Sequence, residues 1–177
     1  SMLQEERGPH GQPARILDAG CGTGLCGPLL RPMASRLVGV DLSPGMLRNV
    51  RDRKHYYDEL LVAELCTYMS ERAGAFDIIV VADTIIYFGA LDQPFRSAYS
   101  ALAPGGTLAF TVEVQRGADS GPGYRLEPHG RYTHRATYME QALRESGLTV
   151  LKCDSVVLRR ECDADVHGLA VLARKAP

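Results

Sequence analysis

The sequence has few cysteines, no closely spaced cysteine pair and no long apolar run. Its cysteines form no CxxC pair and are odd in number: Cys21, Cys26, Cys66, Cys153 and Cys162. This number and spacing of cysteines predict neither a metal site nor a disulfide framework, and they are typical of a protein in a reducing cytoplasm. Because no apolar run reaches membrane-spanning length and the start, 1–11, is polar, we predict no membrane association.

The chain also lacks an excess of either charge. Lys and Arg together number 20 and Asp and Glu 21, a formal net charge of -1 over 177 residues. No overall field would draw such a chain to nucleic acid, so we predict no nucleic-acid partner. The length and the absence of repeats predict one domain over 14–177, preceded by a lead segment over 1–13 that begins with a Ser-Met typical of cloning remnants.

Apolar runs and helical segments alternate along the rest of the chain. Strands are predicted at 14–19, 37–41, 60–62, 76–82, 107–112, 148–153 and 167–173. Helices are predicted at 25–33, 43–53, 92–102 and 137–146, and the Gly- and Pro-rich stretch 116–130 is predicted to be a loop beside a site. The alternation predicts an α/β fold, a doubly wound and mostly parallel sheet that binds ligands beyond the carboxyl ends of its strands.

A glycine-rich loop follows the first predicted strand. Gly20, Gly22 and Gly24 allow a ligand to approach the backbone closely, because glycine has no Cβ. The same stretch matches the dinucleotide fingerprint GxGxxG through Gly27, so the glycines alone do not identify the cofactor. Asp18, just before the loop, would repel a pyrophosphate and suits a cofactor that carries an ammonium and a sulfonium.

Asp41 ends the second predicted strand at the same edge of the sheet. A carboxylate there can accept hydrogen bonds from both hydroxyls of a ribose. Asp41 therefore predicts a nucleoside cofactor without deciding between a nicotinamide and a sulfonium nucleoside.

Four segments, in this order, resemble the motifs of class I S-adenosylmethionine-dependent methyltransferases: 16–24, 38–43 with Met46, 76–82 and 102–106. Segments 57–65, 130–134 and 158–161 are similar to bacterial predicted methyltransferases that often carry tetratricopeptide repeats ahead of the catalytic domain. The repeats are absent here, and the helices that usually precede the first strand are missing or reduced to 1–13. The resemblance implies a Rossmann-like sheet of seven strands whose last strand is antiparallel.

The resemblance implies S-adenosylmethionine as the cofactor and assigns residues to it. Asp41 would bind the ribose, Leu42 and Met46 would lie beside the adenine, and Glu64 and Leu65 would lie at the adenine edge. Most relatives have Asp where this chain has Glu64. The full set of expected cofactor-binding residues is Asp18, Gly20, Cys21, Gly22, Gly24, Asp41, Leu42, Met46, Glu64, Leu65 and Asp83.

Residues on the acceptor side follow from the same architecture. The loop after the fourth strand faces the methyl group, which makes Asp83 and Tyr87 the leading catalytic candidates, and His134 is a third because its ordinary pKa suits a general base. Further candidates near the site are Glu113, Arg131 and Tyr132. Arg159 and Arg160 could bind an acidic substrate, but consecutive strand residues face opposite sides, so at most one should point inward.

The expected function is transfer of a methyl group to an oxygen, carbon or nitrogen atom of a small or carrier-bound molecule. The loop after the fourth strand is not of the NPPY type and no Pro-Cys pair is present, which argues against methylation of exocyclic amines or cytosine in nucleic acid. Two alternatives remain open: a nicotinamide-dependent oxidoreductase that uses Gly22, Gly24 and Gly27, and a noncatalytic module that binds S-adenosylmethionine.

Overall fold

A computed structural model describes residues 12–50, 53–115, 121–161 and 164–177. Its strands are β1 (Ala14–Ala19), β2 (Ala34–Asp41), β3 (Glu59–Val62), β4 (Phe76–Val81), β5 (Leu102–Val114), β6 (Tyr124–Leu126), β7 (Tyr132–His134), β8 (Leu148–Glu161) and β9 (Ala164–Lys175). Its helices are α1 (Gly27–Leu30), α2 (Pro44–Arg48), α3 (Leu65–Ser70), α4 (Asp92–Ala101) and α5 (Ala136–Glu145). Short 3-10 turns are η2 (Arg31–Met33), η3 (Lys54–Tyr56) and η4 (Ile85–Tyr87). Most of the lead segment, 1–11, lies outside the described residues.

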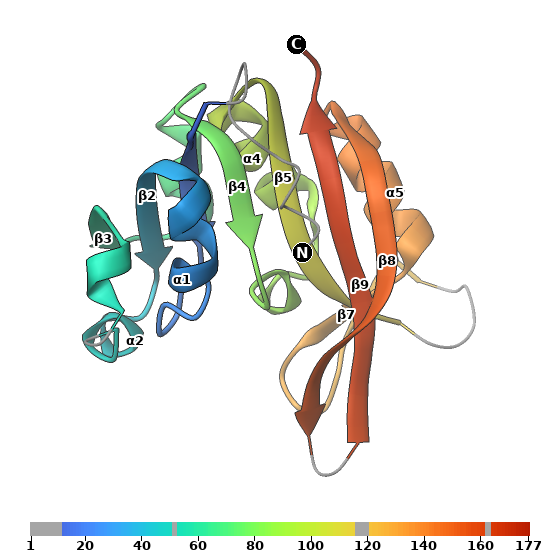
Figure 1. The fold of residues 1–177 in the computed structure, drawn as a ribbon. Coiled ribbons are helices and arrows are strands. Elements are labelled where there is room, and N and C mark those ends of the chain that lie inside the picture. Colours follow the sequence, from blue (N-terminus) through green and yellow to red (C-terminus); the bar gives the residue numbers. More distant parts are fainter. Residues whose placement is uncertain (1–11, 51–52, 116–120, 162–163) are drawn as a thin grey trace.

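The strands form one mixed sheet in the order β3-β2-β1-β4-β5-β7-β6, with β9 paired to both β5 and β8 (Figure 1). β1 runs parallel to β2 and β4, and β4 runs parallel to β5. β9 runs antiparallel to β5. The predicted doubly wound sheet with an antiparallel last strand is therefore confirmed, and all seven predicted strands are present.

Two apolar layers cover the sheet because successive side chains of a strand face opposite sides. Within β1, Ala14 and Ile16 pack into one buried cluster with Leu30 of α1. Leu17 and Ala19 pack into the other, which contains the buried residues of α3, α4 and α5. Figure 1 shows α1 on the near face and α4 and α5 on the far face. This two-sided burial explains why the parallel strands read as continuous apolar runs.

Two predicted helices are shorter than expected. The helix predicted at 25–33 forms α1 and then tightens into η2, because Pro32 has no N–H group to continue the α-helical ladder. The helix predicted at 43–53 begins as expected, with the Ser43 hydroxyl accepting a hydrogen bond from the Met46 N–H at 3.3 Å. It ends at Arg48, and 51–52 lie outside the described residues.

The second half of the chain contains more strand than predicted. β6 lies inside the stretch 116–130 that was predicted to be a loop, and it pairs with β7; residues 116–120 lie outside the described residues. The segment 104–106 is an irregularity within β5, where the register with β4 shifts and Gly105 has a φ of +73°. β8 continues past Cys153 to Glu161, and β8 and β9 together extend beyond the other strands in Figure 1.

No helix in the described ranges is both long and apolar enough to cross a bilayer.

Candidate functional site

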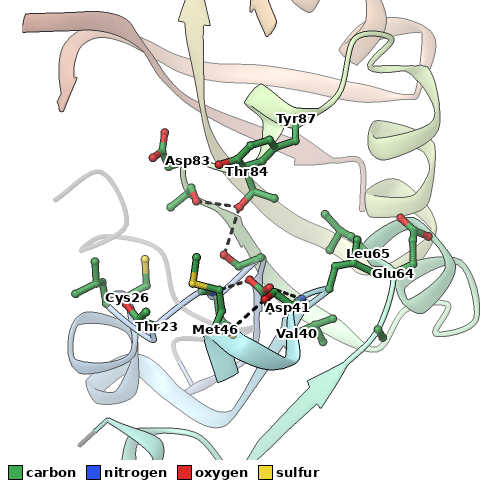
Figure 2. Close-up of a pocket in the computed structure, with 18 of the residues that line it drawn as sticks. Thr23, Cys26, Val40, Asp41, Met46, Glu64, Leu65, Asp83, Thr84 and Tyr87 are labelled. Atoms are coloured by element: carbon green, nitrogen blue, oxygen red, sulfur yellow. Dashed lines mark hydrogen bonds between the residues drawn. The ribbon is translucent and has the colours of Figure 1, made fainter. Parts of the chain in front are cut away.

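A pocket of about 710 Å³ lies at the edge of the sheet where β1, β2 and β4 end. Its volume is in the range of small-molecule and cofactor sites. Figure 2 shows side chains from the loops after these strands around it. Nine predicted cofactor-binding residues line it: Gly20, Cys21, Gly22, Asp41, Leu42, Met46, Glu64, Leu65 and Asp83. Asp18 and Gly24, which were also predicted, do not line it.

Both carboxylate oxygens of Asp41 accept hydrogen bonds from backbone N–H groups. Its Oδ2 accepts a hydrogen bond from Gly22 N–H at 2.8 Å, and its Oδ1 accepts one from Ser43 N–H at 2.8 Å. Each carboxylate oxygen can accept a second hydrogen bond. Asp41 is therefore held in place and still able to receive two further donors, as binding of a vicinal diol requires.

The glycine loop is shaped by close contacts and left-handed backbone. Gly20 has a φ of +77°, and a Cβ there would lie 2.2 Å from the Thr84 hydroxyl oxygen. Gly20 N–H donates to Val40 C=O at 2.7 Å, which binds the loop to β2. Gly22 has a φ of +54° and open space where a Cβ would be. Gly22 is half-buried and lines the pocket, so a ligand can approach its backbone.

Asp18 precedes this loop in β1 and is 1% exposed. The Tyr57 hydroxyl donates a hydrogen bond to Asp18 Oδ2 at 2.6 Å. Burial raises the pKa of Asp18 to about 6, although the hydrogen bond from Tyr57 works in the opposite direction. Asp18 is held by Tyr57 and does not line the pocket, so its predicted place among the cofactor-binding residues stays a prediction.

Tyr57 has a structural role that the sequence analysis did not identify. A Cβ on Gly24, Gly27 or Gly39 would come within 3.2, 2.8 or 3.0 Å of its ring. The third glycine of the GxGxxG match is therefore explained by the packing of Tyr57. The signal in the sequence was the segment 57–65, which resembles a subfamily motif.

Leu42, Met46, Glu64 and Leu65 all line the pocket, and their predicted places beside the adenine stay predictions. Leu42 is 69% exposed and Met46 is half-exposed, and Leu65 is buried. Both Glu64 oxygens cap α3, accepting from Cys66 N–H at 2.9 Å and Thr67 N–H at 2.7 Å. Glu64 therefore serves mainly as a helix cap.

Asp83 and Tyr87 lie across the pocket from Asp41 (Figure 2). Asp83 has a φ of +52°, which is uncommon for a residue with a side chain, and its N–H donates to the Thr111 hydroxyl at 2.9 Å. Partial burial raises the pKa of Asp83, while the Arg159 guanidinium works in the opposite direction. Tyr87 is 62% exposed, so its ring is available to a ligand.

A network of charges lies behind Asp83. Arg159 of β8 donates hydrogen bonds to Asp83 at 2.9 Å, to Glu161 at 2.7 Å and to the buried Glu113. Arg131 donates to Glu161 at 2.6 Å. Arg160 is 72% exposed and faces away, near Asp165 at 3.5 Å. The prediction that at most one of the two consecutive arginines points inward is confirmed.

His134 does not line the pocket and is fully buried in β7. Its Nε2 lies 2.9 Å from Phe88 O and 3.0 Å from Gly89 O, so this nitrogen carries the proton and donates. Burial lowers the pKa of His134. These contacts hold the chain after η4 in place, and they do not fit the predicted role of a base beside an acceptor.

Tyr132 also belongs to this packed region and does not line the pocket. Its ring lies edge-on to that of Tyr124, with centroids 6.0 Å apart.

Comparisons with known proteins give consistent results. The sequence pattern of a family described as "Methyltransferase domain" matches residues 17–110. The chain is 38% identical over 104 residues to the malonyl-[acyl-carrier protein] O-methyltransferase of Geobacter sulfurreducens, covering 57% of this chain and 39% of that protein. It is 34% identical over 108 residues to the 18S rRNA (guanine-N(7))-methyltransferase of Mus musculus, covering 55% and 38%. The chain thus spans less than half the length of these curated relatives.

A solved structure supports the fold. The S-adenosylmethionine-dependent methyltransferase from Mesorhizobium loti aligns with a TM-score of 0.72 and 22% identity, covering 94% of this chain and 93% of that one. At this identity the similarity establishes the fold alone.

Proposed function

Because the chain belongs to the methyltransferase domain family, we propose that it binds S-adenosylmethionine in the pocket beside Asp41 and methylates a small or carrier-bound molecule. The membership confirms the resemblance to class I methyltransferases, and the narrower likeness to repeat-bearing bacterial proteins stays a prediction. The observation that carries the proposal is Asp41, fixed by two backbone N–H groups at the carboxyl end of β2.

The residues present fit this cofactor. The pocket combines a diol-binding carboxylate, Asp41, with the exposed apolar side chains of Leu42 and Met46, which suit a ribose and an adenine. The open backbone at Gly22 suits the polar amino-acid part of the cofactor. Cys21 also lines the pocket, but burial raises the pKa of its thiol to about 12, so it would remain a neutral thiol.

When bound, S-adenosylmethionine supplies a methyl group on a positively charged sulfur. The protein's main contribution is then to hold the acceptor atom in line with that methyl group. We assign this task to Asp83 and Tyr87, which lie across the pocket from Asp41 (Figure 2). In this proposal Asp83 accepts the proton of a hydroxyl or amine acceptor, and the exposed ring of Tyr87 is available to contact it.

The acceptor could belong to several classes, because the curated relatives are named for a carrier-bound substrate and for ribosomal RNA. We propose a small or carrier-bound acceptor. The inward-facing Arg159 and the neighbouring Arg131 are both ion-paired to carboxylates of this chain. Their positive charge is therefore largely neutralised, which gives little attraction for a nucleic-acid backbone.

The two alternative functions differ in how they can be tested. The nicotinamide alternative loses its argument from Gly27, because Tyr57 accounts for that glycine. The noncatalytic module would bind the cofactor without turnover. A screen of methyl acceptors on cofactor-binding protein tests the module, because any methylated product contradicts it.

Calorimetric titration with S-adenosylhomocysteine tests the proposed function. We expect binding by the 177-residue chain, weakened by about 100-fold in Asp41→Ala, since two hydrogen bonds to a carboxylate are lost. Asp154→Ala, on β8 and outside the pocket lining, is the matched control and should bind as the unaltered chain does. Equal affinity of Asp41→Ala and the control would refute the proposed ribose contact.

A further inference from the structure

Arg159 has its charge balanced by carboxylates of its own chain. Its Nε donates to Glu161, one terminal nitrogen donates to Asp83, and the other donates to Glu113. The side chain is 17% exposed. An arginine with all three nitrogens engaged by carboxylates is a poor partner for a further carboxylate from a ligand.

The other arginine that reaches this cluster is also ion-paired, because Arg131 donates to Glu161 at 2.6 Å. Three carboxylates, those of Asp83, Glu113 and Glu161, therefore face two arginines among the described residues. Counted as three carboxylates and two guanidiniums, these groups carry a formal net charge of -1.

Asp83 is the member of this cluster that lines the pocket and is most open to it. Its side chain is 55% exposed, compared with 6% for Glu113 and 35% for Glu161. The carboxyl of Asp83 accepts a hydrogen bond at Oδ1 from Arg159, and among the described residues none reaches Oδ2. An acceptor molecule that enters from this side therefore meets a hydrogen-bond acceptor with negative charge.

We propose that the acceptor presents a hydrogen-bond donor, a hydroxyl or an amine, to Asp83 Oδ2, and that the site disfavours acceptors with a carboxylate at that position. This inference rests on the proposed function, because it assumes that the acceptor lies beside Asp83 in the same pocket. A carboxylate would meet the like charge of Asp83 and find the nearby arginines already paired. Arg159 is then a positioning residue, which holds Asp83 toward β8.

The test compares small ligands that share a phenyl ring and differ in the charge of the attached group. Benzylamine, benzyl alcohol and benzoate are titrated by ligand-observed NMR into the chain saturated with S-adenosylhomocysteine, and again without it. We expect benzylamine to bind at least about tenfold more tightly than benzoate, with benzyl alcohol between them. In Asp83→Asn the preference for benzylamine over benzoate should fall to within about threefold, and in Asp154→Asn it should be unchanged.

Three results would overturn the inference: no measurable binding of benzylamine, benzoate binding as tightly as benzylamine, or a preference that survives in Asp83→Asn. Failure of S-adenosylhomocysteine to bind contradicts the proposed function instead, and the titrations without it still report the charge preference at Asp83. The two failures are therefore distinguishable.

Discussion

Asp18 is a buried carboxyl whose charge is unfavourable in the folded chain. Burial raises its pKa from an ordinary value near 4 to about 6. The folded protein therefore binds this proton more tightly than the unfolded chain does between these two pH values. The stability that the protonated group contributes is fully present below pH 4 and is lost as the pH rises through about 6.

Asp18→Asn removes this pH dependence. Its side-chain oxygen can still accept the hydrogen bond from Tyr57, but it carries no charge. We expect the free energy of unfolding of the variant, relative to the unaltered chain, to increase by about 2–3 kcal/mol between pH 4 and pH 7. Urea unfolding at several pH values measures this difference. Asp154→Asn, which removes a half-exposed carboxylate of β8, is the matched control, and a trend of the same size there would show that burial of Asp18 is not the cause.

The contact between Gly27 and Tyr57 makes a second prediction. Gly27→Ala places a Cβ 2.8 Å from the Tyr57 ring and should lower the free energy of unfolding by about 1–3 kcal/mol through overpacking. In a Tyr57→Ala background the same substitution should cost less than about 0.5 kcal/mol, because the ring is gone. A cost of equal size in both backgrounds would show that Gly27 is required for another reason.

The role of a residue could be predicted from the sequence where its position on the backbone alone decides which groups it faces. Asp41 and Gly22 line the pocket, as the end of a parallel strand and the loop after it lead one to expect. Asp18 and His134 were also expected at the site and do not line the pocket, because hydrogen bonds to Tyr57 and to the backbone after η4 hold them elsewhere. Tyr57 comes from a segment 39 residues away from Asp18, so the sequence pattern carries no direct signal of that contact.

The short helix α3 depends on its first residue. Glu64 accepts hydrogen bonds from two N–H groups in the first turn of α3. The family resemblance assigns Glu64 to cofactor binding instead. We expect Glu64→Ala to lower the free energy of unfolding by about 1–2 kcal/mol while changing S-adenosylhomocysteine affinity less than about threefold. Thermal unfolding and calorimetry measure the two quantities. A large loss of affinity with unchanged stability would restore the role at the adenine edge.

Arg159 connects β8 to the ends of β4 and β5. Arg159→Ala leaves the buried Glu113 without its charged partner and should lower the free energy of unfolding by about 3 kcal/mol. Arg160→Ala is the matched control on the same strand, where an exposed side chain should contribute less than about 0.5 kcal/mol. Denaturant unfolding of both variants checks this, and similar losses in the two would contradict the network.

Elements with an apolar face were predictable, and elements fixed by pairing were not. β1 and β4 are buried on both sides and read as apolar runs, whereas the outer half of β8 is largely polar and partly exposed. β6 and β7 have only 3 residues each and form through their pairing with one another. A window of a few polar residues has no periodicity that distinguishes such strands from a loop.

At the scale of the whole molecule, a bound cofactor should stabilise the fold. S-adenosylhomocysteine at about 100 times its Kd should add about 2.7 kcal/mol to the free energy of unfolding and raise the melting temperature. NADH at the same concentration should have no effect, because the glycine pattern shared with dinucleotide sites is accounted for by Tyr57. Stabilisation by NADH alone would favour the oxidoreductase alternative.

In the proposed complex, the nucleoside of S-adenosylmethionine lies on Asp41 with its reactive end toward Asp83. A crystal structure of the chain with S-adenosylhomocysteine would show this arrangement. We expect both ribose hydroxyls within hydrogen-bonding distance of the Asp41 carboxylate, the adenine beside Met46, and the sulfur on the side of Asp83 and Tyr87. A ligand bound elsewhere, or one whose ribose does not contact Asp41, would contradict it.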